Sequence, residues 1–82
     1  MTNKRKHQLE RKVRINFINF NQIIYPENVG IEFLEIIRRL MFESIRFEHY
    51  RGNITINELH FMARCLIRYY WYYRKLIDKN FG

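Results

Sequence analysis

The sequence predicts an all-α protein, a three-helix antiparallel bundle with a basic, frayed N-terminal arm. Apolar residues recur at three- and four-residue intervals in three stretches, and turn signals separate these stretches. Only 3 Gly and 1 Pro occur, and 48% of the residues are hydrophobic, which excludes a disordered chain. With 82 residues, the chain has room for a single helical domain.

The first predicted helix covers residues 8–25 and follows a basic tail of residues 1–7. At about 100° per residue, six apolar residues share one stripe: Leu9, Val13, Phe17, Phe20, Ile23 and Ile24. The chain also alternates like a short strand from Val13, but this alternation breaks at Ile18. A helix is therefore favoured, with a strand within residues 13–20 as the alternative. Pro26 ends the helix because the residue before a proline is pushed out of the helical region.

The second predicted helix covers residues 31–49. Its predicted core face consists of Phe33, Leu34, Ile37, Leu40, Met41, Ser44 and Ile45. Charged residues of alternating sign line the opposite side at helical spacings, and such pairs stabilise a helix by about 0.2–0.5 kcal/mol each. Gly52 is placed to cap the C-terminal end.

The third predicted helix covers residues 55–79 and has the strongest start signal. Residues 55–58 have the form of a capping box, with Thr55 as the N-cap and Glu58 three residues later, and Ile54 and Leu59 form a hydrophobic staple. Its predicted core face consists of Leu59, Met62, Ala63, Leu66, Tyr70, Tyr73 and Ile77. Short turns between three such helices predict an antiparallel bundle.

Candidate catalytic and metal-binding groups do not converge in the sequence. The one cysteine, Cys65, excludes an internal disulfide framework and an all-cysteine zinc site. His60 and Cys65 are five residues apart on one helix and therefore point in different directions. No glycine-rich phosphate loop and no His or Cys pair with ligand spacing occurs. We expect no enzyme, no cofactor and no metal.

The sequence predicts no membrane span, because no segment approaches about 18 uninterrupted apolar residues. The basic N-terminus is not followed by the apolar stretch of a secretory signal. We therefore expect a cytoplasmic protein. Abundant Ile and Asn suit an A+T-rich genome, and the size fits a phage- or plasmid-encoded accessory factor.

The charge of the chain favours an anionic partner. Lys and Arg number 15 against 8 Asp and Glu, which gives a formal net charge of +7. Basic and aromatic residues interleave on the side of the third helix opposite its core face. The candidate partner-binding residues are Arg64, Arg68, Trp71, Tyr72 and Lys75 on this helix, and Lys4, Arg5 and Lys6 in the tail.

Three interpretations of these residues remain open. Arg and aromatic side chains are enriched at protein-interface hot spots, and they also pair with phosphates and stack on bases. Alternatively, Trp71 packs on the first helix or across a homodimer. The leading hypothesis is a small non-enzymatic regulator or inhibitor that binds an acidic protein surface. The alternative is nucleic-acid binding through the basic arm and the third helix. A helix-turn-helix reader fits poorly, because Arg64 and Arg68 lie several turns into that helix.

The tail and the surplus apolar residues have further interpretations. The tail is either a solvated, frayed terminus or a contact with nucleic acid or anionic lipid, and the lipid interpretation is the weaker. Outside the predicted core lie the apolar residues Ile15, Ile18, Phe42, Trp71 and Tyr72. Because monomers rarely expose large contiguous apolar patches, we expect a homodimer.

Overall fold

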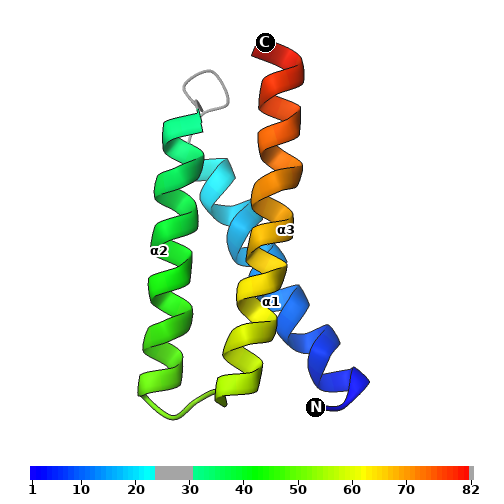
Figure 1. Ribbon diagram of the computed structural model, residues 1–82, viewed down its shortest axis with the longest axis vertical. Helices are drawn as coiled ribbons and strands as arrows, with labels where there is room; N and C mark the ends of the chain where they lie inside the picture. The colour runs from blue at the N-terminus through cyan, green and yellow to red at the C-terminus, as the bar shows by residue number, and fades with distance from the viewer. Residues whose placement is uncertain (24–30, 82) are drawn as a thin grey trace.

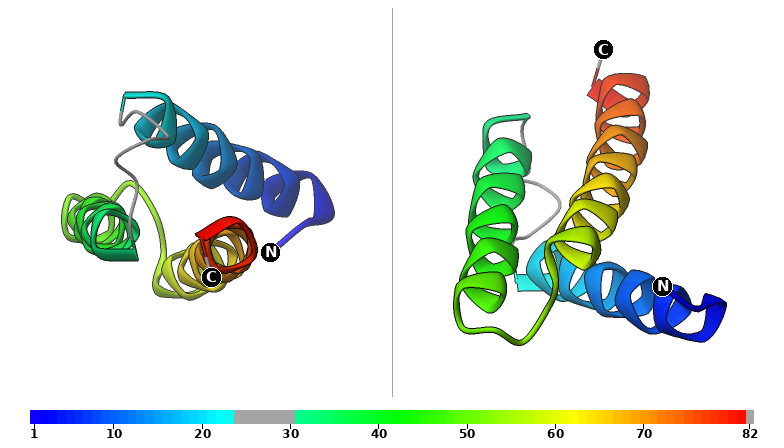
Figure 2. Two further views of the ribbon diagram at one scale, coloured as in Figure 1. Left: turned by 90° about the horizontal axis from the view of Figure 1, so that it is seen from above. Right: turned by 60° about the horizontal axis from the view of Figure 1, so that its bottom comes forward.

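The computed structural model describes residues 1–23 and 31–81, which form three helices, α1 (Asn3–Ile23), α2 (Ile31–Tyr50) and α3 (Ile56–Phe81) (Figure 1). α2 and α3 run antiparallel to each other, and α1 crosses them obliquely on one side (Figure 2). The described residues contain no strand. The prediction of an all-α three-helix bundle is therefore confirmed, and the strand alternative for residues 13–20 is wrong.

α1 begins at Asn3, earlier than predicted, so Lys4, Arg5 and Lys6 lie in its first turns and not in a frayed arm. The physical reason is an N-cap at Thr2 that was not predicted from the sequence. The backbone N–H of Arg5 donates to the Thr2 hydroxyl at 3.1 Å, and the N–H of Lys6 donates to the Thr2 carbonyl at 3.0 Å. A threonine at this position satisfies a backbone donor that would otherwise lack a partner. The predicted end of this helix, at residues 24–25 before Pro26, lies outside the described residues.

One hydrophobic core joins the three helices. Its buried members are Leu9, Val13, Phe17, Leu34, Ile37, Met41, Ile45, Ile54, Leu59, Met62, Cys65, Leu66 and Tyr70. The α1 stripe is confirmed for Leu9, Val13 and Phe17. The side chains of Phe20, Ile23, Ile24 and Phe33, which were also predicted for the core, lie outside the described part of the structure.

Some predicted core positions are wrong. Leu40 is 53% exposed and Ser44 is exposed, whereas Cys65, which was not predicted for the core, is buried. On α2 the buried residues recur at three- and four-residue steps from Leu34, and Leu40 lies about 100° around the helix from its buried neighbour Met41. Ala63, Tyr73 and Ile77 on α3 are only partly buried.

The turn between α2 and α3 is confirmed in detail. Gly52 has a φ of +81°, a conformation that suits glycine, and its N–H donates to the His49 carbonyl at 3.0 Å. The N–H of Asn53 donates to the Glu48 carbonyl at 3.0 Å, which completes a Schellman motif. The capping box follows directly and fixes the start of α3. The Thr55 N–H donates to Glu58 Oε1 at 2.8 Å, and the Glu58 N–H donates to Thr55 Oγ1 at 3.1 Å.

Replacing the N-cap residue, Thr55→Ala, is expected to lower the free energy of unfolding by about 0.5–2 kcal/mol. The alanine removes the oxygen that accepts the Glu58 N–H. Urea denaturation followed by circular dichroism measures the change. Thr55→Ser is the matched control, because it keeps the hydroxyl and should stay close to wild type. Equal stability of Thr55→Ala and wild type would contradict this role for the cap.

Candidate interaction surface

A groove of about 470 Å³ that is open to solvent lies between α1 and α3. α3 supplies five of the lining residues of the groove, and three of these five are tyrosines. The lining residues are Glu10, Arg14 and Ile18 from α1, and Cys65, Arg68, Tyr69, Tyr72 and Tyr73 from α3. The oblique crossing of α1 brings these two helix faces together (Figure 1).

The wall of the groove is held by contacts to the core. The fully buried Phe17 stacks on Tyr73 with ring centroids 5.1 Å apart and lies 6.2 Å from the ring of Tyr69. The Tyr69 hydroxyl donates a hydrogen bond to the carboxylate of Glu10. Burial and then this hydrogen bond raise the pKa of Tyr69 to about 12, so its hydroxyl stays protonated at neutral pH. These contacts hold the Tyr69 and Tyr73 side chains of the groove wall in place.

Two arginines, one from each helix, line the groove. Arg14 and Arg68 are exposed, and within the described residues neither forms an ion pair. Glu10 is the acidic residue of the lining, and its carboxylate already accepts the Tyr69 hydroxyl. The groove therefore combines an aromatic wall with two cationic groups that are available to an anion.

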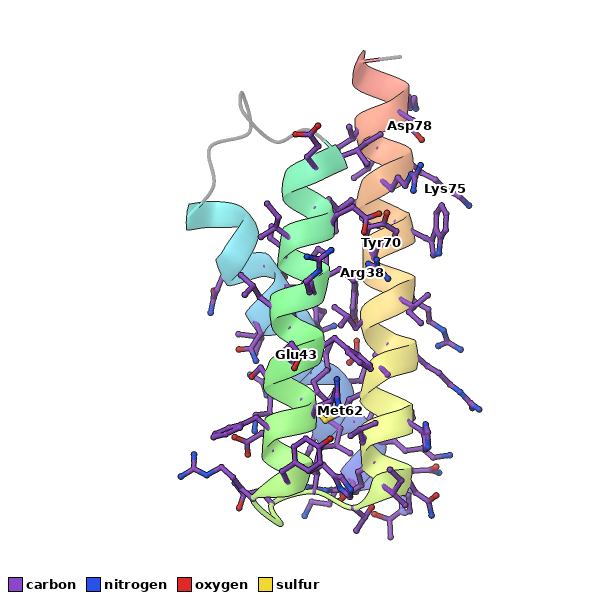
Figure 3. The ribbon with its side chains drawn as sticks, turned by 60° about the vertical axis from the view of Figure 1, so that its left-hand side comes forward. Arg38, Glu43, Met62, Tyr70, Lys75 and Asp78 are labelled. Carbon is purple, nitrogen blue, oxygen red and sulfur yellow. The ribbon has the colours of Figure 1, made fainter. Side chains whose placement is uncertain are left out.

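The structure brings together only part of the predicted α3 surface. All five residues predicted on this helix are exposed: Arg64, Arg68, Trp71, Tyr72 and Lys75. Of these, Arg68 and Tyr72 line the groove. Lys75 points away from α2 (Figure 3).

Trp71 lies outside the groove lining but is held in place by neighbouring side chains. The Arg74 guanidinium lies 5.1 Å from the Trp71 ring centroid, and Tyr70 meets Trp71 edge-on with centroids 5.4 Å apart. Arg74 in turn donates to the Tyr70 hydroxyl at 3.0 Å. The Tyr70 hydroxyl donates to Glu35, and Figure 3 shows Tyr70 and Arg38 facing each other between α2 and α3. Trp71 is therefore a half-exposed, positioned aromatic side chain.

The contribution of α1 to the groove was not predicted from the sequence. Arg14 and Ile18 are four residues apart and so share one face of α1, which was the available signal. The exposed apolar residues also do not form one patch. Ile18 and Tyr72 line the α1–α3 groove, whereas Phe42 lines a separate hollow between α2 and α3.

The predicted basic tail is divided between two roles. Lys4 and Lys6 are exposed on α1. Arg5 is half-buried, and its Nε donates to Glu58 Oε2 at 2.5 Å, which joins the N-terminal ends of α1 and α3. This arginine therefore has a structural contact that was not predicted from the sequence.

The Arg5–Glu58 contact is expected to make the stability depend on pH. The hydrogen bond from Arg5, then that from the Thr55 N–H, holds the pKa of Glu58 below its usual value of 4.5. A carboxyl group whose pKa is lower in the folded state stabilises the fold above its unfolded pKa, and this stabilisation is lost as the pH falls through the folded pKa. The difference in urea midpoint between wild type and Glu58→Gln should therefore shrink from pH 7 towards strongly acidic pH. A pH-independent difference would contradict this assignment.

Neither a metal-binding cluster nor a membrane-spanning helix occurs among the described residues. Among residues 1–23 and 31–81, no group of three or more His, Cys, Asp or Glu side chains could hold a metal ion. In the same part of the chain, no helix has the length and apolarity that crossing a membrane requires. Comparison with known protein families, with curated proteins and with solved structures gives no match to this chain.

Proposed function

We propose that this chain is a small non-enzymatic regulator or inhibitor that binds an acidic, partly apolar surface of another protein in the cytoplasm. The observation that carries the proposal is the α1–α3 groove, where an aromatic wall meets two arginines that form no ion pair within residues 1–23 and 31–81. An apolar side chain of the partner would enter between Ile18 and Tyr72, and carboxylates beside it would pair with Arg14 and Arg68. Arginine and tyrosine are the residue types that dominate binding energy in such interfaces.

Site-specific photo-crosslinking in the native host tests this function. A photoreactive phenylalanine analogue at Tyr72 places the probe in the groove, and the same analogue at Ile56 is the control, since Ile56 is 50% exposed outside the groove. The proposal expects a protein adduct of acidic composition from position 72 and not from position 56. Adducts with nucleic acid alone, or equal adducts from both positions, would contradict it.

Nucleic-acid binding is the second candidate, and the placement of cations on both helices of the groove favours it. Arg14 from α1 and Arg68 from α3 are exposed, and Lys4, Lys6 and Lys75 add positive charge on the same two helices. Binding to duplex DNA would then weaken steeply with salt, with a log–log slope of roughly −0.9 per phosphate contact. A gel-shift series at increasing salt separates the two candidates. If the DNA band does not shift even at low salt, nucleic-acid binding is excluded.

Self-association is a further part of the proposal, and Trp71→Ala tests it. Trp71 is 49% exposed, and its cation–π contact with Arg74 is of a kind that contributes about 0.5–1 kcal/mol at exposed sites. The fold should therefore lose little stability. A central interface tryptophan contributes about 2 kcal/mol or more, so the dimer dissociation constant should rise about 30-fold. Sedimentation equilibrium measures this dissociation constant. A wild-type protein that is monomeric at high micromolar concentration would contradict the homodimer.

A further inference from the structure

A second surface, on α2, has the residue spacing of a coiled-coil seam. Five exposed residues follow one another at steps of four and three: Ile36, Leu40, Glu43, Phe47 and Tyr50. The four apolar members are half-exposed or more, from 51% for Ile36 to 71% for Tyr50. This spacing keeps all five side chains on one face over about 21 Å of helix. We call these residues the α2 seam.

The α2 seam is separate from the core and from the groove. The buried residues of α2 are Leu34, Ile37, Met41 and Ile45, and none of them belongs to the seam. Figure 3 shows Glu43 on the front of α2, with no helix lying over it, and Lys75 on the side of α3 turned away from α2. Among the described residues, none that lines the groove comes from α2. The α2 seam is therefore independent of the groove on which the proposed function rests.

Three arginines form the edges of the α2 seam. Arg39 and Arg46 lie along one edge, and Arg51 lies on the other. Arg46 donates to Glu43 Oε1 at 3.2 Å and to the Tyr50 hydroxyl at 3.1 Å. The Arg51 guanidinium lies 5.3 Å from the Phe47 ring centroid. Glu43, the acidic residue of the seam, is paired with Arg46, whereas Arg39 and Arg51, one on each edge, form no ion pair among the described residues, so both edges of the seam are basic.

This charge pattern disfavours a second copy of the chain as the occupant. In a parallel coiled coil of two α2 helices, Arg46 of one copy would face Arg51 of the other. In an antiparallel arrangement, the edge with Arg39 and Arg46 would face the same edge of the second copy. Both arrangements bring like charges together, whereas a helix with Asp or Glu on both edges would pair with Arg39 on one edge and Arg51 on the other.

We propose that the α2 seam binds an amphipathic helix of another protein, with apolar residues at three- and four-residue spacing and acidic residues on both edges. The seam spans about four helical turns, so a segment of about 16 residues would cover it. Helix docking of this kind uses apolar anchors for affinity and edge charges for the choice of partner. The chain then has two docking surfaces, the α1–α3 groove and the α2 seam.

Synthetic peptides test the proposal directly. The first is a stapled helix of about 16 residues with Leu at the seam positions and Glu at both edges, and the second has Lys in place of Glu. Titration calorimetry at near-physiological salt should show micromolar binding of the acidic peptide, at least about tenfold tighter than binding of the basic peptide.

Variants of the full chain place the binding on the seam. The double variant Leu40→Gln/Phe47→Gln should weaken binding of the acidic peptide by about tenfold or more. The variant Ile56→Gln, at a residue of similar exposure outside the seam, should leave it unchanged. The variant Arg39→Glu/Arg51→Glu should reverse the preference, so that the basic peptide binds more tightly. Thermal unfolding confirms that each variant is folded, because all these side chains are exposed.

Three results would overturn the proposal. The first is no binding of the acidic peptide at millimolar concentration. The second is equal binding of the two peptides, which would remove the role of the arginines. The third is a wild-type dimer that Leu40→Gln dissociates, which would assign the seam to a second copy of the chain. The variant Arg68→Glu, which alters the groove alone, should not affect peptide binding, so failure of this proposal is distinguishable from failure of the groove proposal.

Discussion

Replacing the central core residue, Phe17→Ala, is expected to lower the free energy of unfolding by about 3–5 kcal/mol. The Phe17 side chain is 0% exposed and lies at the packing contact between α1 and α3. Its ring stacks on Tyr73 and contacts Tyr69, so truncation leaves a cavity behind two residues of the groove wall. Because domains of this size are stable by only about 5–15 kcal/mol, the variant should be largely unfolded at moderate urea concentrations.

The matched control for Phe17→Ala is Phe47→Ala. Both variants remove the same benzyl group from a helix, but Phe47 is 57% exposed and has no place in the core. Surface substitutions usually change stability by less than about 0.5 kcal/mol, so the urea midpoint of Phe47→Ala should stay near that of wild type. Similar midpoints for the two variants would show that the crossing of α1 and α3 does not hold the fold together.

The helices could be predicted from the sequence because local signals define them. The capping box at Thr55 and the glycine at position 52 act within a few residues, and both work as predicted. The start of α1 was missed although the same chemistry defines it. Thr2 caps this helix, but the basic residues that follow were interpreted as a frayed arm. Capping residues therefore predict where a helix begins and ends, provided that each possible capping residue in the sequence is taken into account.

The arrangement of the helices could not be predicted in the same way. Leu40 was predicted for the core because it is apolar and near the core face, yet the side chains that pack there belong to Leu34, Ile37 and Met41. Which side of α1 lies beside α3 depends on the crossing angle, and packing of the whole core sets that angle. For this reason Arg68 and Tyr72 were predicted as site residues, whereas Arg14 and Ile18 were not.

Reversing both groove arginines, Arg14→Glu/Arg68→Glu, is expected to weaken binding of the acidic partner protein by about 100-fold or more. Each reversal removes an attractive contact and brings a carboxylate towards the carboxylates of the partner. Interface arginines of the hot-spot class contribute about 2 kcal/mol or more, and each 1.4 kcal/mol is a factor of ten in affinity. The effect should be largest at low salt, because screening weakens both the attraction and the repulsion.

The fold should tolerate this double variant, which makes a loss of binding interpretable. Both arginines are exposed and, in the described part of the chain, neither takes part in an ion pair. The new like-charge pair of Glu10 with a glutamate at position 14 costs only about 0.2–0.5 kcal/mol. Arg14→Gln/Arg68→Gln separates loss of charge from reversal and should give an intermediate affinity, and Arg39→Glu on α2 is the control for net charge. Titration calorimetry with the partner protein that crosslinking identifies measures the affinity. If the charge-reversed variant and wild type bind it equally tightly, the groove is not the docking surface.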